Sequence, residues 1–488
     1  MSLEEHFIQF RKNTIGWDAK IQTPYGIKPL IYADWIASGR LYAPIEELIQ
    51  NKIGPMVANT HSESSDTGMI MTNIYKMSHK IIKSHVNASS DDIIMTYGFG
   101  MTSVVNKLQR ILGLRIPEQA KQFFEISPEE RPVVFLTHME HHSNHTSWLE
   151  TIADVVVLEP NHDLMVDPDS LTREIVKYKD RPLKIGSFSA CSNVTGIRPP
   201  YYKLARIMHE NNGLCFVDFA ASAPYTEIDM HPSDPLERLD AIFFSPHKFL
   251  GGPGSSGVLI MNSALNLNNA PDTSGGGTVD WTNRWGKYKY VDDLETREDG
   301  GTPGFLQSIR AALAIKIKEQ MGCNNIKERE DVMLKKVFGE FRQIPGLNIL
   351  ADNEEERIGV ISFYLTDVHF NLVVRLLNDH FGIQVRGGCS CAGTYGHYLL
   401  HVDYATSCKI TSKINQGDLS EKPGWIRLSL HPTMTDSEID YIIDAVRQVA
   451  ENAKQWGESY HYDSLLNDFV HNSFPRKAPE NYIEWFEI

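Results

Sequence analysis

DAIFFSPHK, residues 240–248, is an apolar, strand-like run that ends in Ser-x-His-Lys, and the glycine-rich turn GGPG follows it at 251–254. A lysine at the mouth of a buried strand can be partly desolvated. Desolvation lowers its pKa and makes the amine a nucleophile toward an aldehyde. Lys248 is therefore a candidate catalytic residue, although most lysines simply lie on exposed loops.

Working outward from this stretch, similar apolar runs alternate with helical patterns between about residues 90 and 261. The runs are 93–97, 133–136, 154–158, 184–189, 214–218, 240–244 and 257–261. Short apolar strands separated by helices are typical of crossover units on a mostly parallel sheet. The sequence therefore predicts an α/β fold with a mostly parallel seven-stranded sheet, whose ligands bind beyond the carboxyl ends of the strands.

Asp218 closes the apolar run LCFV at 214–217, so its carboxylate is expected at that same edge of the sheet. Pyridoxal 5'-phosphate needs such a pair of groups. A lysine amine reacts with its aldehyde, and an anion keeps its ring nitrogen protonated so that the ring can accept electrons. Lys248 and Asp218 together therefore indicate this cofactor, while an aspartate that only caps the following turn remains the alternative.

The cofactor's phosphate requires backbone donors and a hydroxyl at the start of a helix. The segment TYGFGMTS at 96–103 offers them, because it lies between a predicted strand and an apolar-periodic helix. We expect Gly100, Met101 and Thr102 to contact the phosphate. A second glycine run, GGGT at 275–278, either adds donors or is a flexible loop.

The chain is long enough for more than one domain, since it has 488 residues. We expect an N-terminal arm (1–30), a large cofactor-binding domain (31–305), a smaller C-terminal α+β domain (306–460) and a tail (461–488). In the smaller domain we expect helices at 306–320 and 435–452 and strands at 358–365, 383–385 and 425–430. The segment 393–423 is predicted to be a long loop that forms a lid over the substrate pocket.

Composition excludes several classes of partner. The formal net charge is −15 and no Lys/Arg run is present, so no nucleic-acid partner is expected. No apolar run has the length of a membrane span, and the N-terminus lacks the apolar core of a signal peptide. Six cysteines in a chain of this length argue against a disulfide scaffold and favour a reducing, cytoplasmic location.

Four histidines lie within the segment HMEHHSNH at 138–145. Their i, i+4 spacing is compatible with zinc, but no carboxylate or cysteine completes an obvious site, so we expect no metal. The alternative is that one imidazole stacks on the cofactor ring and moves protons.

These motifs resemble the class V aminotransferase group of fold-type I pyridoxal-phosphate enzymes, from YADWIAS at 32–38 to the last helix. The resemblance implies a stacking role for His141 in EHHSN. It also implies a homodimer with shared active sites, in which Thr278 of the opposite subunit reaches the phosphate. The other residues that it implies as cofactor contacts are Asn193, Asp218, Ser245, His247 and Lys248.

Within that group the chain most resembles the cysteine desulfurase and selenocysteine lyase branch. In QVRGGCSCA at 384–392, the Arg-x-Gly-x-x-Cys pattern implies that Cys391 is the nucleophile that takes sulfur from an L-cysteine-type substrate, with Arg386 nearby. The strand WIRLSL at 425–430 implies that Arg427 binds the substrate carboxylate. A sulfur-acceptor protein is a further possible partner.

Two alternatives remain open. Cys389 and Cys391 are a buried structural pair or a metal site if neither is a nucleophile. In that case the chain is a class V aminotransferase, or resembles isopenicillin-N epimerase, and acts on another amino acid without using Cys391.

Overall fold

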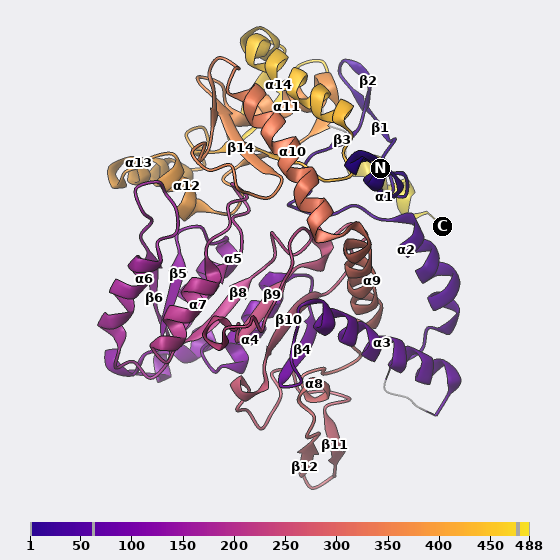
Figure 1. The fold of residues 1–488 in the computed structure, drawn as a ribbon, viewed down its shortest axis with the longest axis vertical. Coiled ribbons are helices and arrows are strands. Elements are labelled where there is room, and N and C mark those ends of the chain that lie inside the picture. Colours follow the sequence, from indigo (N-terminus) through magenta and orange to yellow (C-terminus); the bar gives the residue numbers. More distant parts are fainter. Residues whose placement is uncertain (1, 61–63, 475–478, 488) are drawn as a thin grey trace.

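The structure is a computed structural model that describes residues 2–60, 64–474 and 479–487. A seven-stranded sheet with the order β4-β10-β9-β8-β7-β5-β6 forms its centre (Figure 1). Strands β5 to β9 pair in parallel, and β10 runs antiparallel to both β9 and β4. The strands are β4 Asp92–Tyr97, β5 Val133–Thr137, β6 Asp154–Leu158, β7 Lys184–Ser189, β8 Leu214–Asp218, β9 Ala241–Phe244 and β10 Gly257–Asn262.

This sheet is the predicted one, and most of its strands are buried because helices cover both faces. Strands β5, β7 and β9 are buried along their whole lengths, which explains why they are continuous apolar runs rather than alternating ones. The helices of this part are α2 Ala43–Leu48, α3 Asp66–His85, α4 Met101–Ile111, α5 His142–Leu149, α6 Pro168–Ile175, α7 Tyr201–Glu210, α8 Leu294–Arg297 and α9 Phe305–Met321.

A second, antiparallel sheet with the order β13-β14-β17-β16 organises the C-terminal part, which lies at the top of Figure 1. Its strands are β13 Leu347–Ile349, β14 Val360–Leu365, β16 Arg386–Gly388 and β17 Trp425–Ser429. The helices α10 Cys323–Phe341, α11 Phe370–Phe381 and α14 Asp436–Gly457 share one core cluster with this sheet. A Thr435–Glu438 capping box fixes the start of α14.

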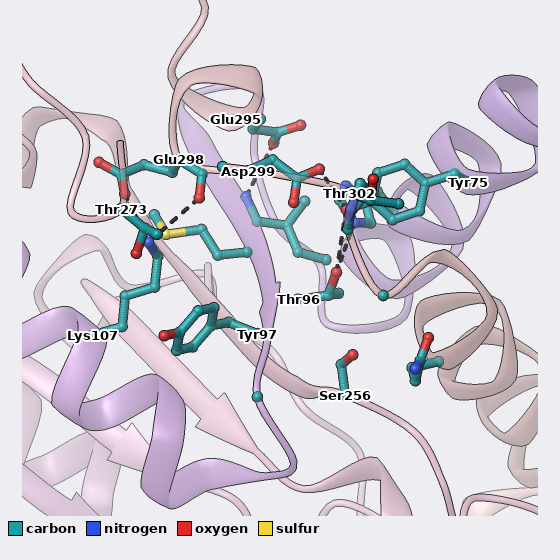
Figure 2. A pocket seen from close by; sticks show the side chains of 18 of the residues that line it. Tyr75, Thr96, Tyr97, Lys107, Ser256, Thr273, Glu295, Glu298, Asp299 and Thr302 are labelled. Atoms are coloured by element: carbon teal, nitrogen blue, oxygen red, sulfur yellow. Dashed lines mark hydrogen bonds and ion pairs between the residues drawn. The ribbon is translucent and has the colours of Figure 1, made fainter. Parts of the chain in front are cut away.

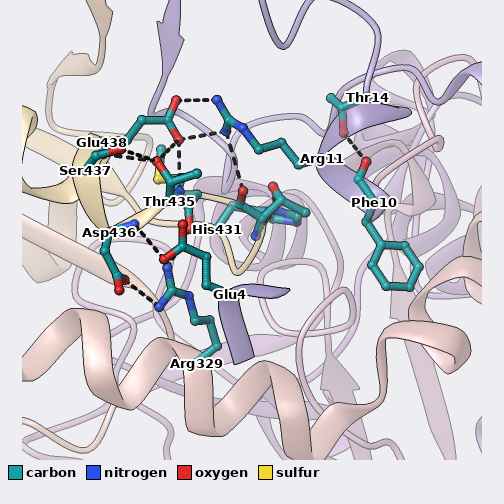
Figure 3. Close-up of polar contacts among 12 residues, drawn as sticks. Glu4, Phe10, Arg11, Thr14, Arg329, His431, Thr435, Asp436, Ser437 and Glu438 are labelled. Atoms are coloured by element: carbon teal, nitrogen blue, oxygen red, sulfur yellow. Dashed lines mark hydrogen bonds and ion pairs between the residues drawn. The ribbon is translucent and has the colours of Figure 1, made fainter. Parts of the chain in front are cut away.

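The N-terminal arm packs against this smaller part. Helix α1 (Leu3–Lys12) buries Phe7 and Phe10 in the same core cluster. Arg11 donates to both carboxylate oxygens of Glu438, at 2.7 and 2.8 Å, at the start of α14 (Figure 3). Helix α1 at the beginning of the chain therefore holds the first turn of the last long helix, α14. The hairpin β1 Lys20–Thr23 and β2 Gly26–Pro29 follows α1.

The strand expected at 383–385 is present as β15 (Ile383–Gln384), and it pairs in parallel with β3 (Ile31–Tyr32) of the N-terminal segment. Another expectation for the C-terminal part was wrong. The segment 393–423 is not a long loop, because it contains α12 (Gly393–Leu399) and α13 (Tyr404–Asn415). The region assigned to the tail begins with a hairpin, β18 Tyr460–Asp463 and β19 Asp468–His471, and β19 lies against α11.

A further hairpin, β11 Val279–Thr282 and β12 Tyr288–Tyr290, projects from the body at the bottom of Figure 1. A buried ion pair fastens the segments beside its base, since Lys107 Nζ on α4 lies 2.8 Å from Glu298 Oε2 (Figure 2). Within the described ranges, none of the helices is both long and apolar enough to cross a membrane.

Candidate active site

Most of the predicted site residues lie at or just after the carboxyl ends of five strands of the large sheet. They meet Arg386 of β16, Arg427 of β17 and Cys391 at one cavity of about 230 Å³. Parallel strands end at the same edge of a sheet, so turns far apart in the sequence become neighbours there. The predicted residues that line this cavity are Met101, Thr102, His141, Asn193, Asp218, Ser245, His247, Lys248, Arg386, Cys391 and Arg427. Gly100 lies just behind this lining, and Thr278 lies outside it, buried beside β11.

Lys248 and Asp218 influence each other within this cavity. Asp218 ends β8 and accepts a hydrogen bond of 2.8 Å from the backbone N–H of Ala220, which fixes the carboxylate. Burial raises the pKa of Asp218, and burial lowers the pKa of the Lys248 amine, while each charge opposes the shift of the other. A lysine whose pKa falls keeps more of its amine neutral, and only the neutral amine is a nucleophile or a base.

His141 is the N-cap of α5. Its Nδ1 accepts a hydrogen bond of 3.1 Å from the backbone N–H of Ser143. Burial, with the cations of Lys248 and Arg427 nearby, lowers the pKa of His141 to about 3. The imidazole is therefore neutral, with its proton on Nε2. A neutral, apolar-faced ring suits the stacking position that the sequence predicts.

The cradle predicted for the phosphate is built from three segments. Ser245 Oγ accepts from the backbone N–H of Met101 at 2.8 Å, and the hydroxyls of Thr102 and Ser143 lie 2.6 Å apart. A Cβ at Gly100 would lie 3.0 Å from Ser245 Oγ and 3.6 Å from the His247 ring. Glycine therefore keeps this space open at the start of α4, where backbone N–H groups favour an anion.

Two arginines share one carboxylate at the other end of the cavity. Arg427 Nη2 lies 2.8 Å from Asp34 Oδ1, and Arg386 Nε lies 3.0 Å from Asp34 Oδ2. Arg427 is deeply buried and also donates to the backbone carbonyl of Asn193 at 3.2 Å. Burial lowers the pKa of Arg427, and the Asp34 carboxylate opposes this shift. Asp34 thus fixes the orientation of both guanidinium groups.

Three buried polar atoms on the cavity lining have no hydrogen-bond partner among the described residues. They are Asn193 Oδ1, Ser390 Oγ and the Arg427 Nε–H. Buried polar groups are nearly always paired in native proteins, so a cluster of unpaired ones around a cavity indicates a bound polar group. The unpaired atoms, the anion cradle and the Lys248–Asp218 pair together fit pyridoxal phosphate with an amino-acid carboxylate near Arg427.

Cys391 lies on an unusual backbone turn between β16 and α12. Its φ is 58° and that of Ser390 is 52°, so two consecutive non-glycine residues are left-handed. Each such residue costs about 1 kcal/mol or more unless its surroundings enforce it. Such strain is concentrated at functional sites. The side chain of Cys391 is exposed and lines the cavity, which leaves its thiol accessible.

The four clustered histidines form hydrogen bonds with four different partners. His138 Nε2 bonds the carbonyl of Leu164 at 3.0 Å, and His141 caps α5. His142 Nε2 accepts from the Gly393 N–H at 3.0 Å, and His145 Nδ1 lies 3.3 Å from Thr394 Oγ1. Within the described residues, no group of three or more histidine, cysteine or acidic side chains is arranged to hold a metal.

Sequence reasoning missed two residues of this site. Asp34 lies within the quoted YADWIAS segment but received no role, and His142 was noted only as a possible zinc ligand. For Asp34 the available signal was a carboxylate within a motif of the resemblance, while two arginines from other segments, Arg386 and Arg427, were expected in the same site. No local pattern indicated that His142 reaches the cysteine turn.

Comparisons with known proteins agree with this geometry. The chain is 27% identical over 366 residues to a probable cysteine desulfurase of Halalkalibacterium halodurans, which covers 75% of this chain and 84% of the relative. It is 25% identical over 425 residues to a probable cysteine desulfurase of Staphylococcus aureus, covering 87% and 93%.

Solved structures show the same fold. The apo cysteine desulfurase of Thermococcus onnurineus matches with a TM-score of 0.73 at 21% identity, over 91% of this chain and 98% of that one. The cysteine desulfurase CsdA of Escherichia coli matches with a TM-score of 0.70 at 21% identity, over the same shares. The predicted fold class is therefore confirmed.

A family model described as Aminotransferase class-V matches residues 31–442, which span most of the chain. This match confirms the resemblance inferred from the motifs, and the chain belongs to the aminotransferase class-V family.

Proposed function

We propose that this enzyme is a pyridoxal-phosphate-dependent cysteine desulfurase, which removes sulfur or selenium from L-cysteine-type substrates. One observation carries the proposal. The exposed Cys391 thiol lines the same cavity as the Lys248 amine and the buried Arg427 guanidinium. A class V aminotransferase or an isopenicillin-N-epimerase-like enzyme would have no use for a thiol there, and the relatives' names do not favour that alternative.

The chain's own residues divide the work of holding the cofactor. Gly100, Met101, Thr102, Ser245 and His247 would hold the phosphate. Asp218 would pair with the ring nitrogen, His141 would stack on the ring and Asn193 would contact it. When bound, pyridoxal phosphate supplies an electron sink for the bond-breaking step at the substrate Cα.

The substrate is held by its carboxylate. Arg427 binds it, in an orientation that Asp34 fixes through Nη2, with Arg386 on the solvent side. Lys248 Nζ removes the Cα proton of the substrate and later returns a proton to a carbon atom of the product. Its lowered pKa favours this role, because the amine is neutral at a lower pH than an exposed lysine.

Cys391 then takes the sulfur. Its thiolate attacks the substrate's sulfur, an S–S bond forms, and the Cβ–S bond breaks. The products are L-alanine and a persulfide on Cys391. Neither oxidant nor reductant is consumed in this transfer. A thiol reductant or an acceptor protein then removes the outer sulfur and regenerates the thiol.

The same proposal includes a homodimer in which Thr278 of the partner subunit approaches the phosphate. Thr278 lies immediately before β11 of the hairpin that projects from the body (Figure 1), and it does not line the cavity of its own subunit. The six cysteines are all unpaired, which suits a reducing, cytoplasmic location.

The test is incubation of the cofactor-loaded protein with L-cysteine and a thiol reductant. We expect alanine and sulfide in equal amounts. Cys391→Ala should abolish sulfide release, whereas the matched Cys408→Ala, at an exposed cysteine on α13, should not change it. Failure of the fully loaded wild type with both L-cysteine and L-selenocysteine would overturn the proposal. Activity that survives Cys391→Ala would favour the transaminase or epimerase alternative.

A further inference from the structure

His142 contacts the cysteine turn with both its backbone and its ring. Its backbone N–H donates to the carbonyl of Cys391 at 2.8 Å, and its Nε2 accepts from the backbone N–H of Gly393 at 3.0 Å. These two hydrogen bonds lie on either side of Ala392, because one holds the Cys391–Ala392 peptide and the other holds the Ala392–Gly393 peptide. His142 itself does not line the cavity.

The turn needs such contacts because Ser390 and Cys391 are both left-handed. A third contact holds its other side, since Asn193 Nδ2 donates to the carbonyl of Ser390 at 2.7 Å. Within the turn, the N–H of Ala392 also bonds the carbonyl of Cys389 at 3.0 Å. A backbone in sparsely populated conformations persists only where its surroundings over-determine it. Asn193 and His142 provide that enforcement from two different segments.

The ring can act as an acceptor only in one form. Because Nε2 accepts from Gly393, the imidazole must be neutral with its proton on Nδ1. Burial and the charge of Lys422 lower the pKa of His142 and so favour this form, with His141 and His145 adjacent on α5. The environment of His142 thus favours the neutral imidazole that the hydrogen bond from Gly393 requires.

We propose that His142 is a positioning residue that holds the left-handed turn at Ser390–Cys391 and thereby aims the Cys391 thiol into the cavity. The inference deepens the proposed function, because it is sulfur transfer to Cys391 that needs this aim. A displacement of about 1 Å can cost a nucleophile on the order of a hundredfold in rate. Loss of the His142 contact is therefore expected to lower kcat rather than to weaken substrate binding.

The test compares His142→Leu, which removes the acceptor, with His142→Gln, which keeps an acceptor oxygen on a side chain of similar length. The control is His145→Leu, one turn further along α5, where only the Thr394 hydroxyl loses its contact. The first readout is amide hydrogen exchange of the peptide that contains Gly393, in the full-length holoenzyme. His142→Leu should speed this exchange about tenfold, while His142→Gln and His145→Leu stay within about twofold of the wild type.

The second readout is the kinetics with L-cysteine. His142→Leu should lower kcat about tenfold with KM and cofactor absorbance nearly unchanged, and His142→Gln should restore most of kcat. Unchanged exchange at Gly393 in His142→Leu, or an equal loss of kcat in His142→Gln, would overturn the positioning role. A wild type without desulfurase activity would overturn the proposed function, whereas the exchange comparison would still decide whether His142 holds the turn.

Discussion

Asp34 binds Arg427 and Arg386 with its two carboxylate oxygens, at 2.8 and 3.0 Å, although 393 and 352 residues separate it from them in the sequence. The two arginines differ in exposure. The Arg427 side chain is 3% exposed, whereas that of Arg386 is 50% exposed. Water can therefore replace Asp34 as a partner of Arg386 but not of Arg427.

Asp34→Asn should consequently destabilise the fold, because it leaves the buried Arg427 charge without its counter-ion. We expect a loss of about 3 kcal/mol in the free energy of unfolding, as is typical when one partner of a buried ion pair is removed. Arg386→Ala should cost less than about 1 kcal/mol, since exposed pairs contribute little. Urea unfolding of both variants measures the difference. Equal losses would show that Arg427 does not depend on Asp34.

A second buried pair joins α4 to the segment that follows the β11–β12 hairpin. Lys107 and Glu298 have side chains that are 1% and 0% exposed (Figure 2). Asp272 Oδ2 lies 3.4 Å from the same Lys107 Nζ. Lys107→Met should lower the free energy of unfolding by about 3 kcal/mol, because Glu298 is left buried without its cation.

The double variant Lys107→Met, Glu298→Met supplies the control. Removing both charges removes the uncompensated one, so the double variant should be more stable than Lys107→Met alone. Urea unfolding gives both values. A double variant that is no more stable than Lys107→Met alone would show that the stability of the buried Glu298 does not depend on the Lys107 charge.

The sequence predicted most of the large sheet and most of the cavity for one physical reason. Runs such as 133–136 and 214–218 are continuous because both faces of the sheet are covered, and parallel strands bring the residues after them to one edge. Lys248 and Asp218 could thus be placed together without knowledge of side-chain contacts.

The features that were missed depend on long-range contacts or lack a local signal. Asp34 meets its arginines through long-range contacts, in a region where the N-terminal segment pairs with β15. Helix α13, YATSCKITSKIN, has none of its residues buried, so no apolar stripe distinguished it from a loop. Its start is nevertheless marked by Asp403, which accepts from the Thr406 N–H at 2.7 Å as an N-cap.

The anion cradle gives a prediction about cofactor binding. Gly100→Ala adds a methyl group 3.0 Å from Ser245 Oγ, which narrows the cradle and moves the hydroxyl that Met101 N–H contacts. We expect the affinity for pyridoxal phosphate to fall about tenfold, which corresponds to about 1.4 kcal/mol. Titration of the apoprotein with the cofactor, followed by its visible absorbance, measures this.

Gly339→Ala is the matched control for that substitution. Gly339 lies inside α10, and a Cβ there would meet nothing within 4 Å. It should leave cofactor affinity unchanged and stabilise the helix by about 0.5–1 kcal/mol. If Gly100→Ala binds the cofactor as tightly as the control does, the phosphate does not lie in this cradle.

His431 gives a prediction about acid stability. Its ring stacks on Trp35, with centroids 3.8 Å apart and planes 15° from parallel, and full burial lowers its pKa to about 3. In the unfolded chain a histidine has a pKa of about 6.5. The unfolded state therefore binds a proton below that value while the folded state does not. The stability contributed by neutral His431 is complete above about pH 6.5 and is lost as the pH falls toward about 3.

His431→Phe keeps the stacked ring and removes this titration. Between about pH 7 and about pH 5, we expect the variant to lose about 2 kcal/mol less unfolding free energy than the wild type. The comparison uses the change with pH, so the loss of the 2.7 Å contact to Thr433 Oγ1, which lowers stability at both values, cancels. His162→Phe, at a side chain that is 88% exposed, should follow the wild type. Parallel pH curves for His431→Phe and the wild type would mean that His431 is protonated as readily in the folded protein as in the unfolded chain.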